Sequence, residues 1–455
     1  MESFKRIIVL QLAGINLLFQ VALYAVLWFN NYADTIQVYF WKRGHWLVII
    51  IYGVLLFFFS RTYGGYQVGY LKPVEVCFSQ IFATICANVF AYFQISLLNG
   101  NLIKPGPLFR VTLLDMIGIA IWTAVSNWLY KSIFAPRELL LIHGDRPIED
   151  IMEKFHSRKD KYKICHCMNI SEGIPAICKE AENRYDAVVI WDIKTEDRNK
   201  ILKYCYGKEI RVYIMPKITD VIIKGSEQLH LFDTPILLTR EYALKIEQRV
   251  IKRMIDLVCA ILLMIITSPI MLITAICIKC YDGGPILYRQ IRCTLGEKEF
   301  GILKFRSMRV DAEKDGVARL AAKNDSRITP IGKFIRRVRI DELPQLFNII
   351  KGDMTFIGPR PERPEIIKQY VEEMPEFAFR TRVKAGLAGY AQVFGKYNTT
   401  PYDKLKLDLF YIENYTIWLD IKLMMLTLKI LLKLESTEGV ETTQVTAMKN
   451  EDEKS

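Results

Sequence analysis

Four long apolar runs lie before residue 140, and they constrain the fold more than any other feature of the sequence. They extend near residues 7–29, 46–60, 74–98 and 108–134, and a helix of about 20 mainly apolar residues can cross the hydrocarbon core of a bilayer. The second run, WLVIIIYGVLLFFFS, is shorter, but aromatic residues on both sides can anchor it at the interfaces. No small-residue cleavage site follows the first run, which favours a retained span over a secretory signal. The sequence therefore predicts a four-helix transmembrane region over residues 1–136.

Basic residues near the ends of these runs predict how the chain is oriented. An excess of Lys and Arg marks the cytoplasmic side of a membrane protein. An inside N-terminus would place Lys5, Arg6, Arg61, Lys72, Lys131 and Arg137 in the cytosol, and Lys42, Arg43 and Lys104 outside. We therefore expect the chain to return to the cytosol after the fourth run. The net charge of +12 indicates an anionic partner, and either a phosphate-bearing ligand or an anionic leaflet satisfies it.

Between residues 137 and 243 the sequence changes to short β-branched runs separated by charged, helix-compatible segments. Such runs occur at residues 139–142, 187–191 and 210–214. Buried strands that alternate with polar helical stretches are typical of a parallel sheet, so we expect a small Rossmann-like α/β domain. The turn after the first strand, at residues 143–147, has one glycine where a dinucleotide-binding turn has three. This favours a scaffold or oligomerisation role over nucleotide binding.

A fifth apolar run, from Met254 to Ile278, is long enough to span a membrane but is interrupted. Asp256 lies near its start, and Ser268 and Pro269 lie at its middle. A simple fifth span is one interpretation. Proline removes a backbone hydrogen bond and clashes with the preceding turn, and a serine beside it can bond the freed groups, so a bent, re-entrant hairpin is the other. The run by itself leaves both interpretations open.

The chain beyond this run is strongly basic. Two strand-like pieces flank a turn at Gly296 and end in Lys304, Arg306 and Arg309, and residues 327–354 place apolar side chains every three or four positions opposite a basic face. A helix lying on an anionic membrane has this pattern, as does a basic helix packed on a core. The following turn, IGPRPERP, presents two arginines. Guanidinium groups bind phosphate oxygens bidentately, so this turn is a candidate phosphate site.

Asp341 and Glu342 are adjacent carboxylates that follow the basic stretch 333–337. Taken alone, such a pair most often forms i,i+4 ion pairs on a helix surface. Near arginines and a divalent cation, however, an aspartate stays ionised and can attack phosphorus, while a second carboxylate takes a proton or holds the metal. Mg²⁺ prefers hard oxygen ligands, so we expect it on Asp341, Glu342 and substrate phosphates. The chemistry predicted for this pair is phosphoryl transfer.

Several ordered blocks of the sequence resemble the bacterial sugar transferases, also called monotopic polyprenol-phosphate phosphoglycosyl transferases. The blocks are GGPILYRQIR, KFRSMRVDAE, ITPIGKFIRRVRIDELPQLFNIIKGDM, FIGPRPERP, VKAGLAGYAQVFGKYN and KLDLFYIENYTIWLDIKL. They place a catalytic domain at residues 247–435, and the preceding spans and α/β domain resemble the long form of the family. The resemblance implies transfer of a sugar-1-phosphate from a UDP-sugar to undecaprenyl phosphate with release of UMP. It also implies that this step begins exopolysaccharide, capsule or O-antigen synthesis.

The resemblance assigns roles to individual residues. Asp341 would be the nucleophile that forms a covalent phosphosugar-aspartate, and Glu342 would assist attack by the polyprenol phosphate. The residues expected to contact substrate or phosphate are Lys304, Arg306, Arg360 and Glu362. One block departs from the family pattern PGxTGWAQV, because this chain reads AGLAGYAQV at residues 385–393 and lacks the proline, the hydroxyl and the tryptophan. Specificity inferred from relatives therefore does not carry over to this loop.

The resemblance also favours the re-entrant interpretation, because UDP-sugars are cytosolic and a fifth crossing would place Asp341 outside. We expect a re-entrant helix over residues 250–279, bent at Ser268 and Pro269, and interfacial amphipathic helices that include residues 405–433. A polar tail would occupy residues 436–455. The expected fold class is a membrane protein with an α-helical transmembrane bundle, a small Rossmann-like α/β domain and a mixed α/β catalytic domain. It would be a multi-pass cell-membrane protein with its catalytic domain on the cytoplasmic face.

The expected partners are a UDP-sugar, undecaprenyl phosphate, membrane lipid and a second copy of the chain, with no nucleic acid. Two other functions fit parts of the sequence. A membrane-anchored scaffold or regulatory protein that keeps the fold would bind partners but release no UMP. A polytopic glycosyltransferase would release UDP, but its metal site is usually an Asp-x-Asp triplet, and the Asp-Arg-Asn and Asp-Ala-Glu triplets of this chain lie in no suitable setting. The intact carboxylate pair and arginine turn favour the transferase.

Overall fold

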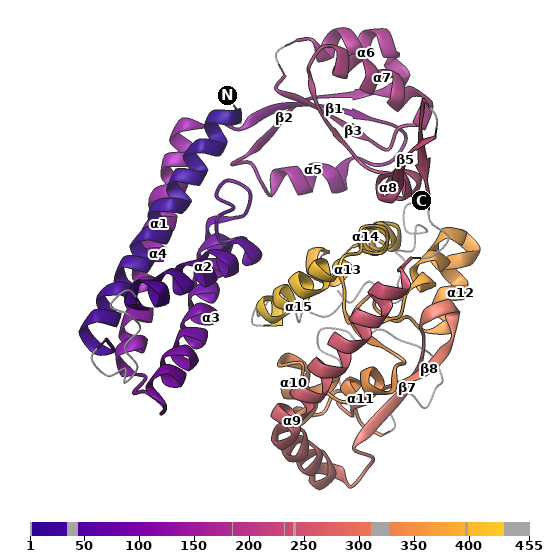
Figure 1. Cartoon of the computed structure of the whole chain (residues 1–455). Helices are drawn as coiled ribbons and strands as arrows, with labels where there is room; N and C mark the ends of the chain where they lie inside the picture. The colour runs from indigo at the N-terminus through magenta and orange to yellow at the C-terminus, as the bar shows by residue number, and fades with distance from the viewer. Residues whose placement is uncertain are drawn as a thin grey trace. The chain divides into compact units, whose positions relative to one another are not determined.

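A computed structural model describes residues 2–33, 44–183, 185–231, 233–239, 243–310, 327–395 and 399–431 (Figure 1). The chain divides into two compact units, residues 1–215 and 216–455, and each has its own arrangement of helices and strands. The polar tail expected at residues 436–455 lies outside the described residues.

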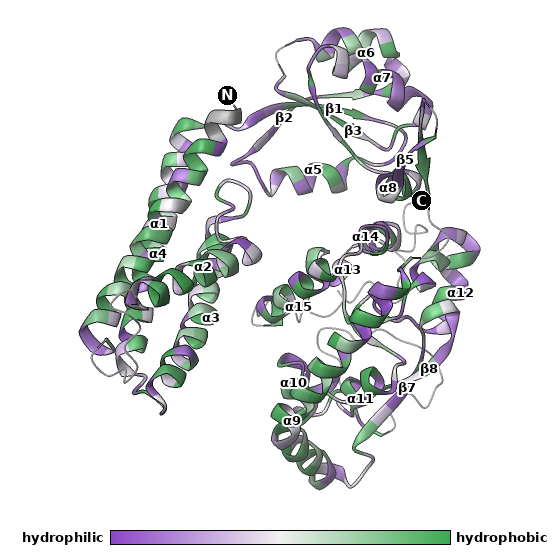
Figure 2. Ribbon diagram, in the orientation of Figure 1, coloured by the Kyte–Doolittle hydropathy of each residue, from purple (hydrophilic) through white to green (hydrophobic). Residues whose placement is uncertain are grey.

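Four long helices open the first unit, as the apolar runs predict. They are α1 (Glu2–Asn31), α2 (Gly44–Tyr63), α3 (Pro73–Asn99) and α4 (Gly106–Ile133), and each is long and apolar enough to cross a membrane. Figure 2 shows hydrophobic residues along all four helices. Helix α2 extends beyond its short apolar run at both ends. With 20 residues it reaches about 30 Å, enough for the hydrocarbon core.

A ladder of polar side chains links α1 to α3 inside this bundle. The Asn16 side-chain amide donates to Gln80 Oε1, and one helical turn further Thr84 Oγ1 donates to Gln20 Oε1 at 2.8 Å. All four side chains are buried. Apolar packing alone gives little preference for one helix partner over lipid, so interhelical hydrogen bonds of this kind help to hold transmembrane helices together.

The rest of the first unit is the predicted α/β domain. Strands β1 (Arg137–His143), β2 (Tyr162–Asn169), β3 (Ala187–Trp191) and β4 (Arg211–Ile214) form a parallel sheet in the order β2-β1-β3-β4. The connections contain α5 (Glu149–His156), η1 (Ile170–Glu172), α6 (Ile174–Ala181) and α7 (Thr195–Gly207). The central strands β1 and β3 are buried on both faces, as continuous apolar runs predict. The parallel α/β architecture is therefore confirmed.

The division between the units differs from the boundary expected near residue 243. Helix α8 (Ile218–Gly225) contributes Ile218 and Val221 to the hydrophobic core of the second unit. After it, β5 (Glu227–Leu231) and β6 (Thr234–Leu238) form an antiparallel hairpin. The apolar strand pattern of the α/β domain stops at β4, so the domain ends close to residue 215.

Helix α9 (Ile246–Asp282) is the fifth helix long and apolar enough to cross a membrane, and it contains Pro269. Proline cannot donate a hydrogen bond to the carbonyl of Ile265, and the Ser268 hydroxyl donates to that carbonyl at 2.8 Å. Figure 1 shows α9 changing direction along its length. The serine and proline therefore act together, because the serine supplies the donor that the proline lacks.

Two charged residues bond the start of α9 to other elements of the second unit. The Lys252 ammonium donates to the carbonyl of Ile357 at 2.9 Å and to Asp420 at 2.6 Å. The Arg253 guanidinium donates to the carbonyls of Ile349 and Ile350 at 2.6 and 2.7 Å. The start of α9 is thus bonded to the main chain of two other segments, one ending at Ile357 and one containing Ile349 and Ile350.

Both ends of α9 contact the same folded unit. Near the start, the Asp256 carboxylate accepts hydrogen bonds from the Phe356 backbone amide at 3.0 Å and from the Thr355 hydroxyl at 2.7 Å. At the other end, Asp282 forms an ion pair with Arg306, the residue that follows strand β8. Residues at both ends of α9 are therefore bonded to other elements of the same unit.

The second unit combines short strands and helices around a large hydrophobic core and a smaller one formed by Ile278, Phe305 and Ile335. Its antiparallel hairpin consists of β7 (Leu287–Cys293), η2 (Leu295–Glu297) and β8 (Glu299–Phe305), and its parallel pair of β9 (Thr355–Ile357) and β10 (Gly386–Ala388). The helices are α10 (Pro330–Arg337), η3 (Ile340–Glu342), α11 (Gln345–Lys351), α12 (Pro364–Glu373), η4 (Pro375–Arg382), α13 (Tyr390–Phe394), α14 (Pro401–Glu413) and α15 (Ile417–Leu431). The amphipathic stretch expected at residues 405–433 is therefore two helices, α14 and α15.

Candidate active site

A continuous basic helix over this segment would place the two adjacent carboxylates on a helix face. In the structure they do not lie on one. Helix α10 ends at Arg337, and Asp341 and Glu342 form the short 3-10 turn η3 before α11. The interruption comes from Arg339, whose φ of 59° is left-handed. The segment is therefore a helix, a tight turn and a second helix, and the turn carries the carboxylate pair.

Asp341 is buried and its carboxylate is only partly satisfied. Its side chain is 8% exposed, and Oδ1 has no hydrogen-bond partner among the described residues. Burial raises the pKa of Asp341, the neighbouring Glu342 raises it further, and the charges of Lys304, Arg336 and Arg339 lower it, with a net value of about 6. A carboxyl with this pKa is still mainly ionised at pH 7, and it becomes protonated as the pH falls through about 6.

Glu342 has the opposite environment. Its Oε1 atom accepts from Lys304 at 3.1 Å and from Arg360 at 3.3 Å, and Arg339 lies 3.8 Å away. Burial raises the pKa of Glu342, but these three cations lower it well below its ordinary range. Two neighbouring carboxylates therefore differ sharply: one is held ionised by a cluster of cations, and the other has an oxygen free to react or to bind a metal.

Two of the predicted phosphate contacts meet at this cluster. Lys304, on β8, and Arg360, in the turn after β9, come from distant parts of the chain and bind the same oxygen of Glu342. Arg306 is held elsewhere, by the ion pair with Asp282 at the end of α9. Its Nη1 atom is buried without a hydrogen-bond partner among the described residues.

Glu362, the other residue predicted to contact substrate, belongs to a second ionic cluster. It forms an ion pair with Lys404, and its carboxylate oxygens lie 3.6 Å from Arg292 and 3.8 Å from Arg380. Burial raises the pKa of Glu362, but Lys404 and Arg380 lower it to about 2. Arg380 also donates to the buried Asp408 at 2.6 Å. Sequence reasoning missed Arg380, Lys404 and Asp408, because their partners are far away in the chain and no local motif joins them.

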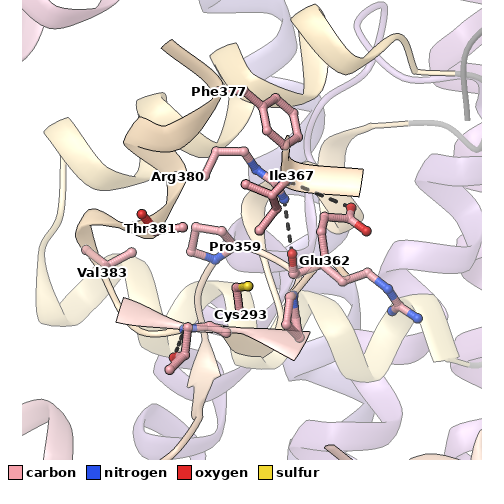
Figure 3. A pocket seen from close by; sticks show the side chains of 12 residues that line it. Cys293, Pro359, Glu362, Ile367, Phe377, Arg380, Thr381 and Val383 are labelled. Atoms are coloured by element: carbon pink, nitrogen blue, oxygen red, sulfur yellow. Dashed lines mark hydrogen bonds and ion pairs between the residues drawn. The ribbon is translucent and has the colours of Figure 1, made fainter. Parts of the chain in front are cut away.

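This second cluster forms one wall of a small pocket beside the arginine turn. Figure 3 shows Arg380 reaching across the pocket toward Glu362, with Pro359 and Cys293 nearby. Arg360 also lines the pocket and binds Glu342 of the carboxylate pair. The arginine turn therefore connects the pocket to the carboxylate pair, and an anionic group in the pocket would meet guanidinium groups from two elements.

Close backbone packing positions the arginine turn. Strands β9 and β10 are parallel, so the loops after both strands leave the same edge of the pair. A Cβ atom at Gly358 would overlap the carbonyl of Lys384, and one at Gly389 would overlap the carbonyl of Gly358. These two glycines allow the turn containing Arg360 to lie directly against the AGLAGYAQV block. Tyr390, which stands where the family pattern has tryptophan, begins α13 and packs on Phe394.

The predicted Mg²⁺ site is only partly matched by the side chains. Among the described residues no three His, Cys, Asp or Glu side chains are gathered as a metal site. The buried, unpartnered Oδ1 of Asp341 fits a metal ligand, whereas Oε1 of Glu342 is already bound by cations. The residues present therefore suit an ion held by one carboxylate, with the remaining ligands supplied by substrate phosphates and water.

Comparison with known proteins identifies the second unit. Residues 247–434 match the family model described as bacterial sugar transferase. The chain is 37% identical over 259 residues to the UDP-N-acetylgalactosamine-undecaprenyl-phosphate N-acetylgalactosaminephosphotransferase of Aeromonas hydrophila, covering 55% of this chain and 59% of that protein. It is 37% identical over 190 residues to the UDP-glucose:undecaprenyl-phosphate glucose-1-phosphate transferase of Caulobacter vibrioides, covering 41% of this chain and 71% of that protein.

A third relative aligns over nearly the whole chain. An uncharacterized sugar transferase of Haemophilus influenzae is 26% identical over 457 residues, which is 92% of this chain and 95% of that protein. With several other undecaprenyl-phosphate sugar phosphotransferases the matched segment spans about half of their length, from 43% to 58%. The family model, these relatives and the motif-bearing turn at Asp341 and Glu342 agree, and the chain belongs to the bacterial sugar transferase family.

Proposed function

We propose that this protein transfers a sugar-1-phosphate from a UDP-sugar to undecaprenyl phosphate and releases UMP. The observation that carries the proposal is the contrast within the carboxylate pair: Asp341 has a buried, unpartnered oxygen, and Glu342 is fixed by Lys304 and Arg360. A nucleophile and an adjacent cluster of cations are what phosphoryl transfer needs. The names of the relatives support this reaction class, and the product would begin an exopolysaccharide, capsule or O-antigen unit.

The proposed reaction has two steps on the same aspartate. In the first, Asp341 Oδ1 attacks the phosphorus that bears the sugar, the bond to the bridging oxygen breaks, and UMP leaves with that oxygen and its electron pair. In the second, a phosphate oxygen of undecaprenyl phosphate attacks the same phosphorus, and the Asp341 carboxylate leaves. The products are UMP and undecaprenyl diphosphate-sugar, so atoms and charge balance.

The other side chains of the site stabilise charge during these steps. Lys304 and Arg360 both lie against Glu342, the neighbour of Asp341, and their positive charges would stabilise negative charge that develops on the phosphate. Glu342 keeps the two cations together beside the nucleophile, and it assists attack by the lipid phosphate. A bound Mg²⁺, held mainly by the donor phosphates and water beside Asp341, would neutralise charge on the pyrophosphate and leave Oδ1 of Asp341 free to attack.

We also propose that α9 is re-entrant and that the catalytic unit faces the cytoplasm. The support is that Lys252 and Asp256 at one end of the helix and Asp282 at the other bind one folded unit. A helix that crossed the bilayer would separate these ends by the whole membrane thickness. The catalytic unit would then lie at the headgroup level, where a water-soluble donor and a lipid acceptor can reach the same aspartate.

Replacing Asp341 tests the nucleophile. We expect Asp341→Asn to lower UMP release by at least about 10³-fold, because the amide keeps the size of the side chain but cannot attack phosphorus. The assay uses membranes with undecaprenyl phosphate and a panel of UDP-sugars, and it separates UMP from UDP. Asp233→Asn, in the exposed turn of the β5–β6 hairpin, is the matched control. UDP as the product would indicate a direct glycosyltransferase, and release of neither nucleotide by the wild type would indicate a scaffold.

The environment of Asp341 predicts an acid limit on the first step. Its raised pKa of about 6 means that the carboxyl becomes protonated, and loses its nucleophilic oxygen, as the pH falls through about 6. An aspartate with the ordinary value of 3.8 would stay active to lower pH. The measurement is the pH dependence of UMP release in a single turnover with donor alone. A rate that stays constant down to pH of about 4.5 would contradict the proposed environment.

Metal removal tests the expected cofactor. We expect a chelator to abolish UMP release and Mg²⁺ to restore it, because the pyrophosphate of the donor needs a hard cation to screen its charge. Adding the chelator already saturated with Mg²⁺ is the control for other effects of the reagent. Full activity in excess free chelator would remove Mg²⁺ from the proposal.

Cysteine labelling in intact cells tests the path of α9. In a background where the exposed Cys165, Cys277 and Cys280 are serine, a cysteine placed after Glu435 should resist a membrane-impermeant reagent. Pro269→Leu should leave it protected, because the charged contacts hold both ends of α9. Asn101→Cys, in the loop between α3 and α4 that the orientation places outside, is the positive control. Labelling of the C-terminal cysteine in the otherwise unaltered protein would contradict the re-entrant path.

A further inference from the structure

The backbone at Arg339 has a conformation that usually belongs to glycine. Helix α10 ends at Arg337, Val338 caps it, and Arg339 follows with φ 59° and ψ 19°. Glycine commonly occupies this position after a helix, because a Cβ atom is disfavoured in the left-handed region. A long side chain here therefore opposes the local backbone preference, and it persists where the surrounding structure holds it.

Arg339 differs from the other non-glycine residues that have a positive φ. Among the described residues, positive φ also occurs at Asp192, Glu209 and Glu297. These three are acidic and exposed, whereas the Arg339 side chain is basic and 33% exposed. Arg339 is also the member of this set that lies in the turn bearing the carboxylate pair.

The side chain and the backbone of Arg339 both contact Glu342. The guanidinium Nη1 lies 3.8 Å from Oε1, the same oxygen that Lys304 and Arg360 bind. The carbonyl of Arg339 accepts a hydrogen bond from the Glu342 amide at 3.3 Å. The left-handed residue thus closes a three-residue turn and adds a third cation to the Glu342 carboxylate. A glycine could close the turn but could not supply the cation.

We propose that Arg339 is a positioning residue, whose left-handed backbone and guanidinium together hold the Glu342 carboxylate between Lys304 and Arg360. This role rests on the proposed function, and it adds a residue that the motif-based assignment does not include. Arg339 acts through Glu342 and not on the donor, so its loss affects turnover more than donor binding. The arginine is retained at a cost in backbone conformation because the site needs its charge.

Three variants of the full-length protein in membranes separate the backbone contribution from the side chain. Arg339→Gly relieves the left-handed conformation and removes the cation. Arg339→Lys keeps a cation at a position that stays conformationally disfavoured. Glu297→Gly relieves the same conformation at the exposed tip of the β7–β8 hairpin and is the matched control. The measurements are kcat and the KM for the UDP-sugar from UMP release, and the thermal unfolding midpoint of each variant.

The expected results differ among the three. Arg339→Gly should lower kcat roughly tenfold, with a donor KM within about twofold of the wild type. Its unfolding midpoint should equal or exceed that of the wild type, because glycine suits the backbone. Arg339→Lys should restore kcat to within about threefold of the wild type. Glu297→Gly should not change kcat, and its midpoint should also be unchanged or higher.

Four outcomes would overturn the inference. A wild-type kcat for Arg339→Gly would show that the guanidinium is not needed. A raised KM with unchanged kcat would make Arg339 a donor contact. A fall in the unfolding midpoint together with kcat, without rescue by lysine, would make its role purely structural. No UMP release by the wild-type protein would remove the proposed function and this inference together, whereas the first three outcomes leave the proposed function intact.

Discussion

The hydrogen bonds from the start of α9 to main-chain groups connect two of the segments that carry the site. Lys252 binds the carbonyl of Ile357, the last residue of β9 and three residues before Arg360, and Arg253 binds the final turn of α11, which follows the carboxylate pair. Because the acceptors are backbone carbonyls, these hydrogen bonds do not require particular side chains on β9 or α11. Helix α9 is therefore bonded directly to the elements that precede Arg360 and follow the carboxylate pair.

Among the carboxylates of the site, Asp341 differs from Glu342, Glu362 and Asp408 in its ion pairing. Glu342 and Glu362 are each surrounded by several cations, and Asp408 is paired with Arg380. Burying a carboxylate is costly, and such partners offset the cost. Asp341 has an oxygen without such a partner, in a region where lysine and arginine leave a local excess of positive charge. A diphosphate-bearing ligand, such as the proposed donor, would be attracted to that excess of positive charge.

The carboxylate pair and its two nearest cations were predictable because their motifs are contiguous, but the shape of the turn was not. Apolar residues recur at helical spacing from Ile331 through Leu346, and this periodicity is insensitive to a single left-handed residue such as Arg339. Lys304 and Arg306 are two apart and would share a strand face. Strand β8 ends at Phe305, so Arg306 lies beyond the sheet and turns to Asp282 instead. The partners of Glu362 come from η4 and α14, which no spacing in the sequence joins to the arginine turn.

The parallel sheet and the four apolar helices followed from composition and periodicity, because burial on two faces or in lipid leaves a strong pattern. The boundary between the units was harder to predict. Helix α8 looks like a continuation of the alternating α/β pattern, and only its packing against the core of the second unit reveals where it belongs. Tertiary contact, not local propensity, decides such a case.

The polar ladder of the transmembrane bundle fixes the axial register of α1 relative to α3. Its rungs are one turn apart on both helices, so a shift of about 5.4 Å would set Asn16 against Thr84 and still give it a polar neighbour. The same shift would set the buried Gln80 amide against Leu12, where no side chain could replace Asn16. The register is therefore favoured at the end of the ladder by the apolar Leu12, which lies about one turn before Asn16 on α1.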